Sequence, residues 1–279
     1  MNSNNYKYTN EWYNSYPLQN GFDAHLKYFN SGAKENQDYW ECFNGRPDFE
    51  NKTIVDVGCG HGSLCIDIAV SNSSSKVIGV DISEELIDFA KWNLHVNYPE
   101  LESRVEFYCN DIRELTLPPV DAVLSKASFE HILDLDDVLK CIKSKLKPGG
   151  KLYTGFMPLY HSQFGGHPRI HRFLPFPWLP WAHLMASEKF ILSRVNAQRE
   201  QKASSIFELG LNKLSINDFR ALFEDSGLKQ VFFKINVPGR SWKATMMSAL
   251  SKIKGLEKYM VYSIFAILEK PVDNKSTNG

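Results

Sequence analysis

The residues with the clearest chemical potential lie in one short turn. Asp56 precedes three glycines on alternate positions, Gly58, Gly60 and Gly62. Glycine has no Cβ, so a ligand can approach the backbone N–H groups of such a turn closely. Asp56 adds a carboxylate at the end of an apolar, strand-like run, which is where open α/β sheets bind ligands. The segment therefore predicts a ligand site.

Two further acids follow later apolar runs in the same way. Asp81 ends the segment KVIGVD, about 20 residues after the glycine turn. A carboxylate there can accept hydrogen bonds from both hydroxyls of a ribose, although a simple helix cap is the competing interpretation. Asp111 follows RVEFYCN at a comparable interval. Three acids at successive strand ends predict one shared nucleoside-like site.

Histidines are the candidate general bases, because the unperturbed pKa of histidine is close to the working pH. His131 follows a fourth strand-like run, where a structural role at a helix start is the competing interpretation. His161 and His167 lie in a proline-rich segment. His167 is the first choice, because Gly165-Gly166 before it frees the backbone for close approach.

The same segment raises a metal site as an alternative. His161, His167 and His171 could supply imidazole ligands, with Gln163 nearby. Their spacing matches no recognised closed site, and no cysteine or acid cluster accompanies them. The sequence therefore predicts no metal, and a metal-assisted reaction is kept as a minor alternative.

The elements that must position these residues form an alternating pattern. Five strand-like runs alternate with helix-forming segments, and this predicts a doubly wound, mostly parallel sheet. A capped helix starting at Ser215 and two more strand-like runs follow. The predicted strands cover 53–57, 76–80, 104–109, 120–125, 151–156, 228–237 and 258–269.

The glycine turn, with an acid two residues before its first glycine, resembles motif I of the class I S-adenosylmethionine-dependent methyltransferases. Its G-x-G-x-G spacing differs from the dinucleotide fingerprint G-x-G-x-x-G. The later segment LKPGGKL is similar to the same family. The resemblance covers about residues 50–156 and 214–270. It implies an α/β fold with a seven-stranded sheet whose last strand is antiparallel.

The resemblance also implies a role for each residue of the site. Asp81 would bind the ribose of S-adenosylmethionine, and Ile82 would form an apolar wall for its adenine. Asp111 would meet the adenine amino group, and the backbone N–H of Ile112 a ring nitrogen. The complete expected cofactor set is Asp56, Gly58, Gly60, Gly62, Asp81, Ile82, Asp111, Ile112 and Ser125.

The chain is expected to divide into five parts. Residues 1–50 form an aromatic-rich helical arm, and residues 51–156 form the cofactor-binding core. Residues 157–213 form an inserted lid between the fifth strand and the next helix, and in the family this position commonly builds the acceptor pocket. Residues 214–270 complete the core, and residues 271–279 form a disordered tail.

The composition limits the classes of partner that the protein is expected to bind. Lysine plus arginine and aspartate plus glutamate number 32 each, so no global charge attracts nucleic acid. No apolar run is long enough to span a membrane. The five cysteines lack metal or disulfide spacing, which favours buried free thiols in a reducing cytoplasm. The apolar run FLPFPWLPW has three interpretations: burial against the lid or a partner subunit of a homodimer, contact with a small, partly hydrophobic acceptor, or superficial contact with a membrane.

These observations predict a methyltransferase acting on an O or N atom of a small metabolite, with secondary metabolism as the expected setting. Transfer from a sulfonium is an in-line displacement, so the protein must mainly position donor and acceptor. A hydroxyl acceptor also needs a base. A nucleotide-dependent oxidoreductase and a cofactor-binding relative without catalysis remain as alternatives.

Overall fold

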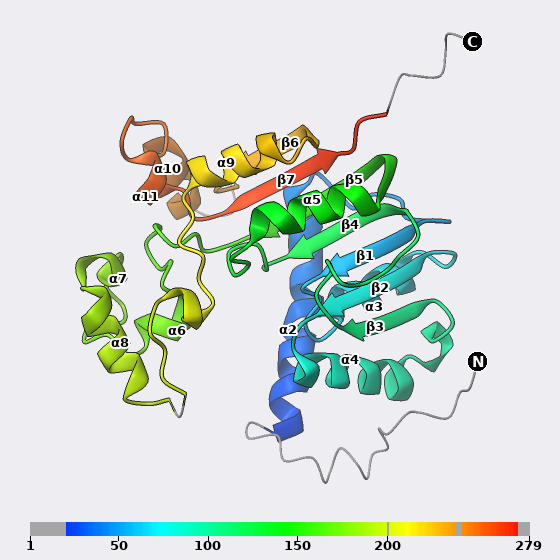
Figure 1. Cartoon of the computed structure of the whole chain (residues 1–279), viewed down its shortest axis with the longest axis horizontal. Coiled ribbons are helices and arrows are strands. Elements are labelled where there is room, and N and C mark those ends of the chain that lie inside the picture. The colour runs from blue at the N-terminus through cyan, green and yellow to red at the C-terminus, as the bar shows by residue number, and fades with distance from the viewer. Residues whose placement is uncertain (1–20, 200, 238–241, 273–279) are drawn as a thin grey trace. The chain divides into compact units, whose positions relative to one another are not determined.

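The computed structural model describes residues 21–199, 201–237 and 242–272. The chain divides into two compact units, residues 1–124 and 125–279, and each is described by itself. Its strands form one seven-stranded sheet in the order β3-β2-β1-β4-β5-β7-β6 (Figure 1). The predicted α/β class, with mostly parallel strands and an antiparallel last strand, is confirmed.

The first unit holds the glycine turn on parallel strands. β1 (Thr53–Val57) lies between β2 (Lys76–Asp81) and β4 (Val120–Lys126), and β3 (Val105–Cys109) pairs with β2. Their apolar residues are buried, as expected for strands covered by helices. The carboxyl ends of β1, β2 and β3 therefore share one edge of the sheet.

Helices α3 (Ser63–Ser71) and α4 (Glu84–Asn97) follow β1 and β2. Ser83 caps α4 as its side chain accepts from the N–H of Leu86. Ser63, in contrast, is the first residue of α3, and Gly62 at φ 77° is the N-cap without a side-chain cap. Serine after the glycine turn is a residue type that can cap a helix, but Ser63 does not cap α3. The short helix η1 (Pro99–Leu101) precedes β3.

The sequence of the N-terminal arm favours two short helices, over 23–29 and 35–43, but the structure has one long helix there. α2 (Gly21–Cys42) runs for 22 residues and packs along α3 (Figure 1). Its buried rings, Phe29, Tyr39 and Trp40, lie on one helical face. The first 20 residues of the arm and the tail from residue 273 lie outside the described residues.

The second unit carries the antiparallel part of the sheet. β5 (Leu146–Phe156) pairs with β7 (Ile264–Glu269), which pairs with β6 (Lys229–Ile235). β5 begins five residues before the predicted start, because Gly149 donates to the carbonyl of Lys270 and the ladder extends. β7 begins six residues late, since Glu257–Met260 form helix α11.

The helices of this unit agree with the sequence in part. α5 (Leu135–Lys145) and α9 (Ile216–Asp225) occur as predicted, and Ser215 forms a capping box with Asp218. The segment 181–201 forms two short helices, α7 (Ala182–Met185) and α8 (Glu188–Asn196), because Ser187 starts a new helix with its own cap. The remaining helices are α6 (His167–His171), η2 (Phe207–Leu209) and α10 (Trp242–Leu250).

The inserted segment has a core of its own. Its buried side chains form one cluster that includes Tyr160, Ile170, Leu174, Ile191 and Leu209. A lid that is only a flexible loop would lack such a core. The segment 157–213, which is called the packed cap below, is therefore organised around these buried side chains. Among the described residues, no helix is long and apolar enough to cross a membrane.

Candidate cofactor site and histidine cluster

The glycine turn is tied to the end of the neighbouring strand by Asp81. The Oδ2 atom of Asp81 accepts the N–H of Gly60 at 2.9 Å, and Oδ1 accepts the N–H of Ser83 at 2.9 Å. A carboxylate has about four acceptor positions, so both oxygens can still accept from a ligand. Asp81 thus fixes the turn and stays able to bind hydroxyls.

The three glycines of the turn serve different purposes. All have positive φ: 74° at Gly58, 53° at Gly60 and 77° at Gly62. A Cβ at Gly60 would meet only Leu86, at 4.0 Å, whereas a Cβ at Gly62 would lie 2.5 Å from the ring of Phe107. Gly60 therefore leaves open space, as a ligand-binding turn requires, and Gly62 is required by packing.

Ile82 has the exposure expected of a ligand wall. Its side chain is 80% exposed, directly after Asp81 at the end of β2. A large apolar side chain in water is unfavourable by about 1.5–3 kcal/mol relative to burial. A planar ring lying on Ile82 would remove this cost. The described residues of this edge therefore fit an adenine nucleoside.

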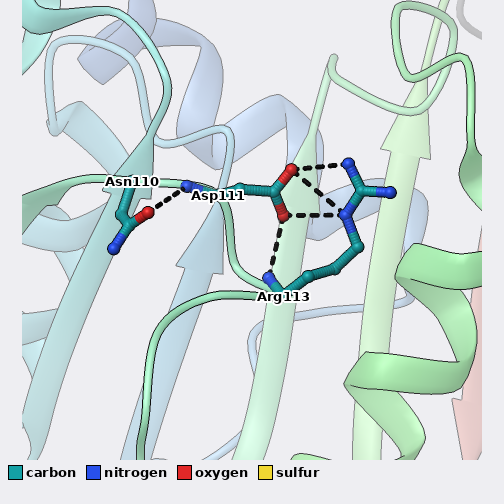
Figure 2. A network of polar contacts seen from close by, with 3 residues as sticks. All are labelled: Asn110, Asp111 and Arg113. Carbon is teal, nitrogen blue, oxygen red and sulfur yellow. Dashed lines mark hydrogen bonds and ion pairs between the residues drawn. The ribbon is translucent and has the colours of Figure 1, made fainter.

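Asp111 lies at the same sheet edge but already has a cationic partner (Figure 2). Nε of Arg113 lies 3.0 and 3.1 Å from its two oxygens, and Nη2 lies 2.7 Å from Oδ2. These bonds hold the pKa of the Asp111 carboxyl below its usual value. An adenine amino group would share this carboxylate with Arg113. The neighbouring Ile112 is buried.

Asp56 has a different environment. Its side chain is 2% exposed, and its Oδ2 lies 3.5 Å from the Sγ of Cys65 on α3. Burial raises the pKa of the Cys65 thiol well above its usual value, so the thiol stays protonated. The convergence of Asp56, Asp81 and Asp111 on one cofactor site stays a prediction. Ser125, the last expected cofactor residue, is fully buried.

The second unit brings two of the predicted histidines together. The rings of His131 and His167 lie 4.9 Å apart between centroids. Nδ1–H of His131 donates to the carbonyl of Gly210 at 2.7 Å, and Nε2–H of His167 donates to that of Pro158 at 2.9 Å. Each ring thus keeps one nitrogen lone pair. These carbonyls fix the tautomers.

Burial weakens both rings as bases. It lowers the pKa of His131, with a further contribution from the charge of Arg169. It lowers the pKa of His167 to about 4, with a further contribution from His131. A histidine with a pKa near 4 is neutral at physiological pH but is a weak proton acceptor. His131 and His167 therefore both remain predicted bases, each with its pKa lowered by burial.

The other histidines of the segment bond elsewhere. Nε2–H of His161 donates to the carbonyl of Lys213 at 3.1 Å, so His161 is separate from the His131 pair. His171 and His183 face each other at 3.0 Å, and His183 also bonds the carbonyl of Tyr160 at 2.6 Å. Among the described residues, no three potential ligand side chains are placed to hold a metal.

Two groups that sequence reasoning missed stand out. Glu130 is 4% exposed, and burial raises its pKa to about 8, so this carboxyl is neutral at physiological pH. Its place between Phe129 and His131 at a strand end was the available signal. His61, within the glycine turn itself, is 7% exposed and bonds His25 of α2 at 2.8 Å between Nε2 and Nδ1.

The thiols were predicted in part. All five cysteines are free; Cys42, Cys59 and Cys65 are buried, whereas Cys109 is exposed and Cys141 is half-buried. The expectation of burial was therefore wrong for Cys109. It is the last residue of β3, a strand at the edge of the sheet.

Comparison with known proteins supports a methyltransferase domain in this chain. Residues 48–164 match a family model described as a methyltransferase domain. The human mitochondrial ubiquinone biosynthesis O-methyltransferase is 36% identical over 103 residues, which are 36% of this chain and 27% of the relative. Its Coxiella burnetii counterpart is 36% identical over 107 residues, 37% of this chain and 43% of the relative. The chain thus matches less than half the length of these relatives.

A solved structure extends the likeness in fold. The geranyl diphosphate C-methyltransferase from Streptomyces coelicolor, solved with S-adenosyl-L-homocysteine, has a TM-score of 0.53 at 17% identity, covering 86% of this chain and 79% of that chain. At this identity it supports the fold alone. With the family-model match and the glycine turn, it leads to one conclusion: residues 48–164 form a methyltransferase domain of the S-adenosylmethionine-dependent kind, within a chain that has the class I methyltransferase fold.

Proposed function

We propose that this protein transfers the methyl group of S-adenosyl-L-methionine to an oxygen of a small, partly hydrophobic acceptor. The observation that carries the proposal is the carboxylate of Asp81, which holds the N–H of Gly60 at 2.9 Å and retains acceptor positions for ribose hydroxyls. The relatives matched over this core are named O-methyltransferases, which favours oxygen over nitrogen as the acceptor atom.

In this proposal the residues of the first unit hold the cofactor. Asp81 accepts from the ribose, and exposed Ile82 packs on the adenine. Asp111 and the Ile112 N–H bind the adenine edge. The cofactor supplies an activated methyl group, so the protein contributes binding and orientation, which can lower a barrier by about 7–11 kcal/mol in favourable cases.

The base proposed for a hydroxyl acceptor is His131. Its Nδ1–H is held by the carbonyl of Gly210, so Nε2 carries the lone pair that would take the proton. The neighbouring His167 ring limits how His131 can turn. The acceptor pocket is proposed to involve the packed cap formed by residues 157–213.

The test is calorimetric titration of the full chain with S-adenosyl-L-homocysteine. We expect binding in the micromolar range for the wild-type protein and at least tenfold weaker binding for Asp81→Asn. Asp88→Asn, an acid on α4, serves as the matched control. Absence of binding by the wild-type chain at submillimolar ligand would overturn the proposal.

A further inference from the structure

Helix α2 is joined to the glycine turn by a line of three polar side chains. Nδ1 of His25 lies 2.8 Å from Nε2 of His61, which stands between Gly60 and Gly62. Nε2 of His25 lies 3.1 Å from Oε1 of Glu85 on α4. Both imidazoles are 7% exposed. The line thus connects α2, the turn and α4.

Aromatic packing surrounds this line. The ring of Tyr28 lies 4.6 Å from that of His61 between centroids. Phe89 lies 5.6 Å from His25 and 5.1 Å from His61. These rings keep water from the two imidazoles, and in a less polar environment a hydrogen bond between them is stronger than in water.

Helix α2 also touches the start of α3. Nδ2 of Asn36 donates to the carbonyl of Ser63 at 3.1 Å. A Cβ at Gly32 would lie 2.7 Å from the Oγ of Ser63, so the two helices approach closely there. α2 therefore contacts both the turn and the helix that follows it.

Proton positions along the line follow from its end. An ionised Glu85 only accepts, so Nε2 of His25 carries a proton. With His25 neutral, its Nδ1 accepts from Nε2–H of His61, whose Nδ1 then has no proton. That Nδ1 is buried and has no hydrogen-bond partner among the described residues. Protonating it would create a buried N–H without an acceptor, which is costly.

We propose that His25 is a positioning residue for the cofactor-binding turn, and that its contact with His61 makes cofactor binding weaken as the pH falls. This inference rests on the proposed function, because it assumes that the turn binds S-adenosyl-L-methionine. The charged or titratable groups in contact with the pair are Glu85 from α4 and Tyr28 from α2. Asp81 acts on the turn through the N–H of Gly60.

The direction of the pH effect follows from linkage. Burial lowers the pKa of His61 to about 4 while α2 is in place, with a smaller contribution from the neighbouring His25. With α2 displaced, His61 would be in water and titrate near its ordinary value of about 6.5. The open form alone then binds a proton between these values. Each pH unit below 6.5 favours it by at most about tenfold.

The experiment measures the Kd of S-adenosyl-L-homocysteine at pH 8, 6.5 and 5.5 for the full chain. We expect the wild-type affinity to fall severalfold between pH 8 and 5.5. His25→Phe should bind severalfold more weakly at pH 8 and lose most of this pH dependence. His95→Gln is the matched control, because His95 forms an exposed pair with Glu102 at 2.7 Å in the same unit.

Hydrogen exchange of residues 21–36 provides a readout that needs no ligand. After correction for intrinsic exchange rates, the protection of α2 should decrease as the pH is lowered, both in the wild-type chain and in His95→Gln. Glu85→Gln, which keeps an acceptor for His25, replaces His25→Phe if that variant fails to fold, and should reduce protection at pH 8.

The outcomes separate the two proposals. Wild-type binding and α2 protection that do not change with pH would overturn the role of the His25–His61 contact and leave the methyltransferase proposal intact. The same conclusion follows if His25→Phe retains the wild-type pH dependence. If the chain binds no S-adenosyl-L-homocysteine at any pH but the protection of α2 still decreases as the pH is lowered, the proposed function is overturned. The role of the His25–His61 contact is then still supported.

Discussion

The carboxylate of Asp81 receives the backbone N–H of Gly60 across 21 positions of sequence, at 2.9 Å. This bond connects the end of β2 to the turn after β1, and it explains why an acid at this strand end matters before any ligand is bound. Its second oxygen holds the N–H of Ser83, where α4 begins. One side chain thus organises three elements.

The first prediction concerns Asp81 itself. Asp81→Ala should lower the free energy of unfolding by about 1–3 kcal/mol, because the partly buried N–H groups of Gly60 and Ser83 lose their acceptor. Asp81→Asn keeps one carbonyl oxygen and should cost less. Urea unfolding of both variants checks this order. Equal stability of both variants and the wild type would show that the bond to Gly60 contributes nothing to folding.

The second prediction separates two glycines of the turn. Gly62→Ala should destabilise the protein by about 1–3 kcal/mol through overpacking, because its Cβ would lie 2.5 Å from Phe107. Gly60→Ala carries only the strain of a left-handed conformation, about 1 kcal/mol. Thermal unfolding measures both. The double variant Gly62→Ala/Phe107→Leu tests the steric cause. Its Tm should be higher than the value obtained by adding the Tm changes of the two single variants.

The third prediction uses the buried Glu130. Its pKa is raised to about 8 from 4.5 by burial, so the folded state favours the neutral carboxyl. The contribution of Glu130 to the free energy of unfolding is therefore complete below pH 4.5. Roughly 3–5 kcal/mol is lost as the pH rises from 4.5 to 8. Glu130→Gln keeps the shape without the charge. We expect it to raise Tm at pH 9 relative to wild type and to have little effect at pH 5; an unchanged Tm difference across this range would contradict the buried, neutral state.

The fourth prediction tests the proposed base. His131→Asn should lower kcat by about 10²–10⁴-fold once an acceptor is known, while the Kd for S-adenosyl-L-homocysteine stays within twofold. Because burial lowers the pKa of His131, the wild-type rate should stay constant from pH 8 to below 6.5 and fall only at lower pH. His161→Asn, whose ring bonds the carbonyl of Lys213 instead, is the control. A kcat for His131→Asn equal to that of this control would exclude His131 as the base.

The fifth prediction concerns the helix that restarts the core after the cap. Ser215 and Asp218 satisfy each other's backbone N–H groups at the start of α9. Ser215→Ala should therefore lower stability by about 1 kcal/mol, whereas Ser215→Asp should be nearly neutral. Chemical denaturation with both variants distinguishes a cap from a merely exposed serine.

Much of this architecture follows from local sequence. The strand ends at Asp56 and Asp81, and the caps at Ser83 and Ser215, were predictable because each depends on a few neighbouring residues. The last strand was predicted to begin too early, at Lys258. The segment KYM is β-prone but has no partner strand among the described residues, and it lies in helix α11 instead. Propensity is a weak guide when the partner is missing.

The site was less predictable because its contacts join distant segments. Arg113 forms an ion pair with the carboxylate of Asp111, and the spacing of the two residues alone does not predict this pair. His25 and His61 are 36 residues apart and meet only because α2 packs on α3. Likewise, the low pKa of His167 depends on its burial and on His131, which is 36 positions earlier in the sequence.

The exposed side chain of Ile82 has a thermodynamic consequence. Covering it with a ligand ring removes apolar surface from water, so cofactor association should carry a negative heat capacity change, with an enthalpy that becomes more favourable as the temperature rises. Shortening this side chain to alanine would make that temperature dependence less steep. The temperature dependence of the binding enthalpy therefore reports on the burial of this one isoleucine.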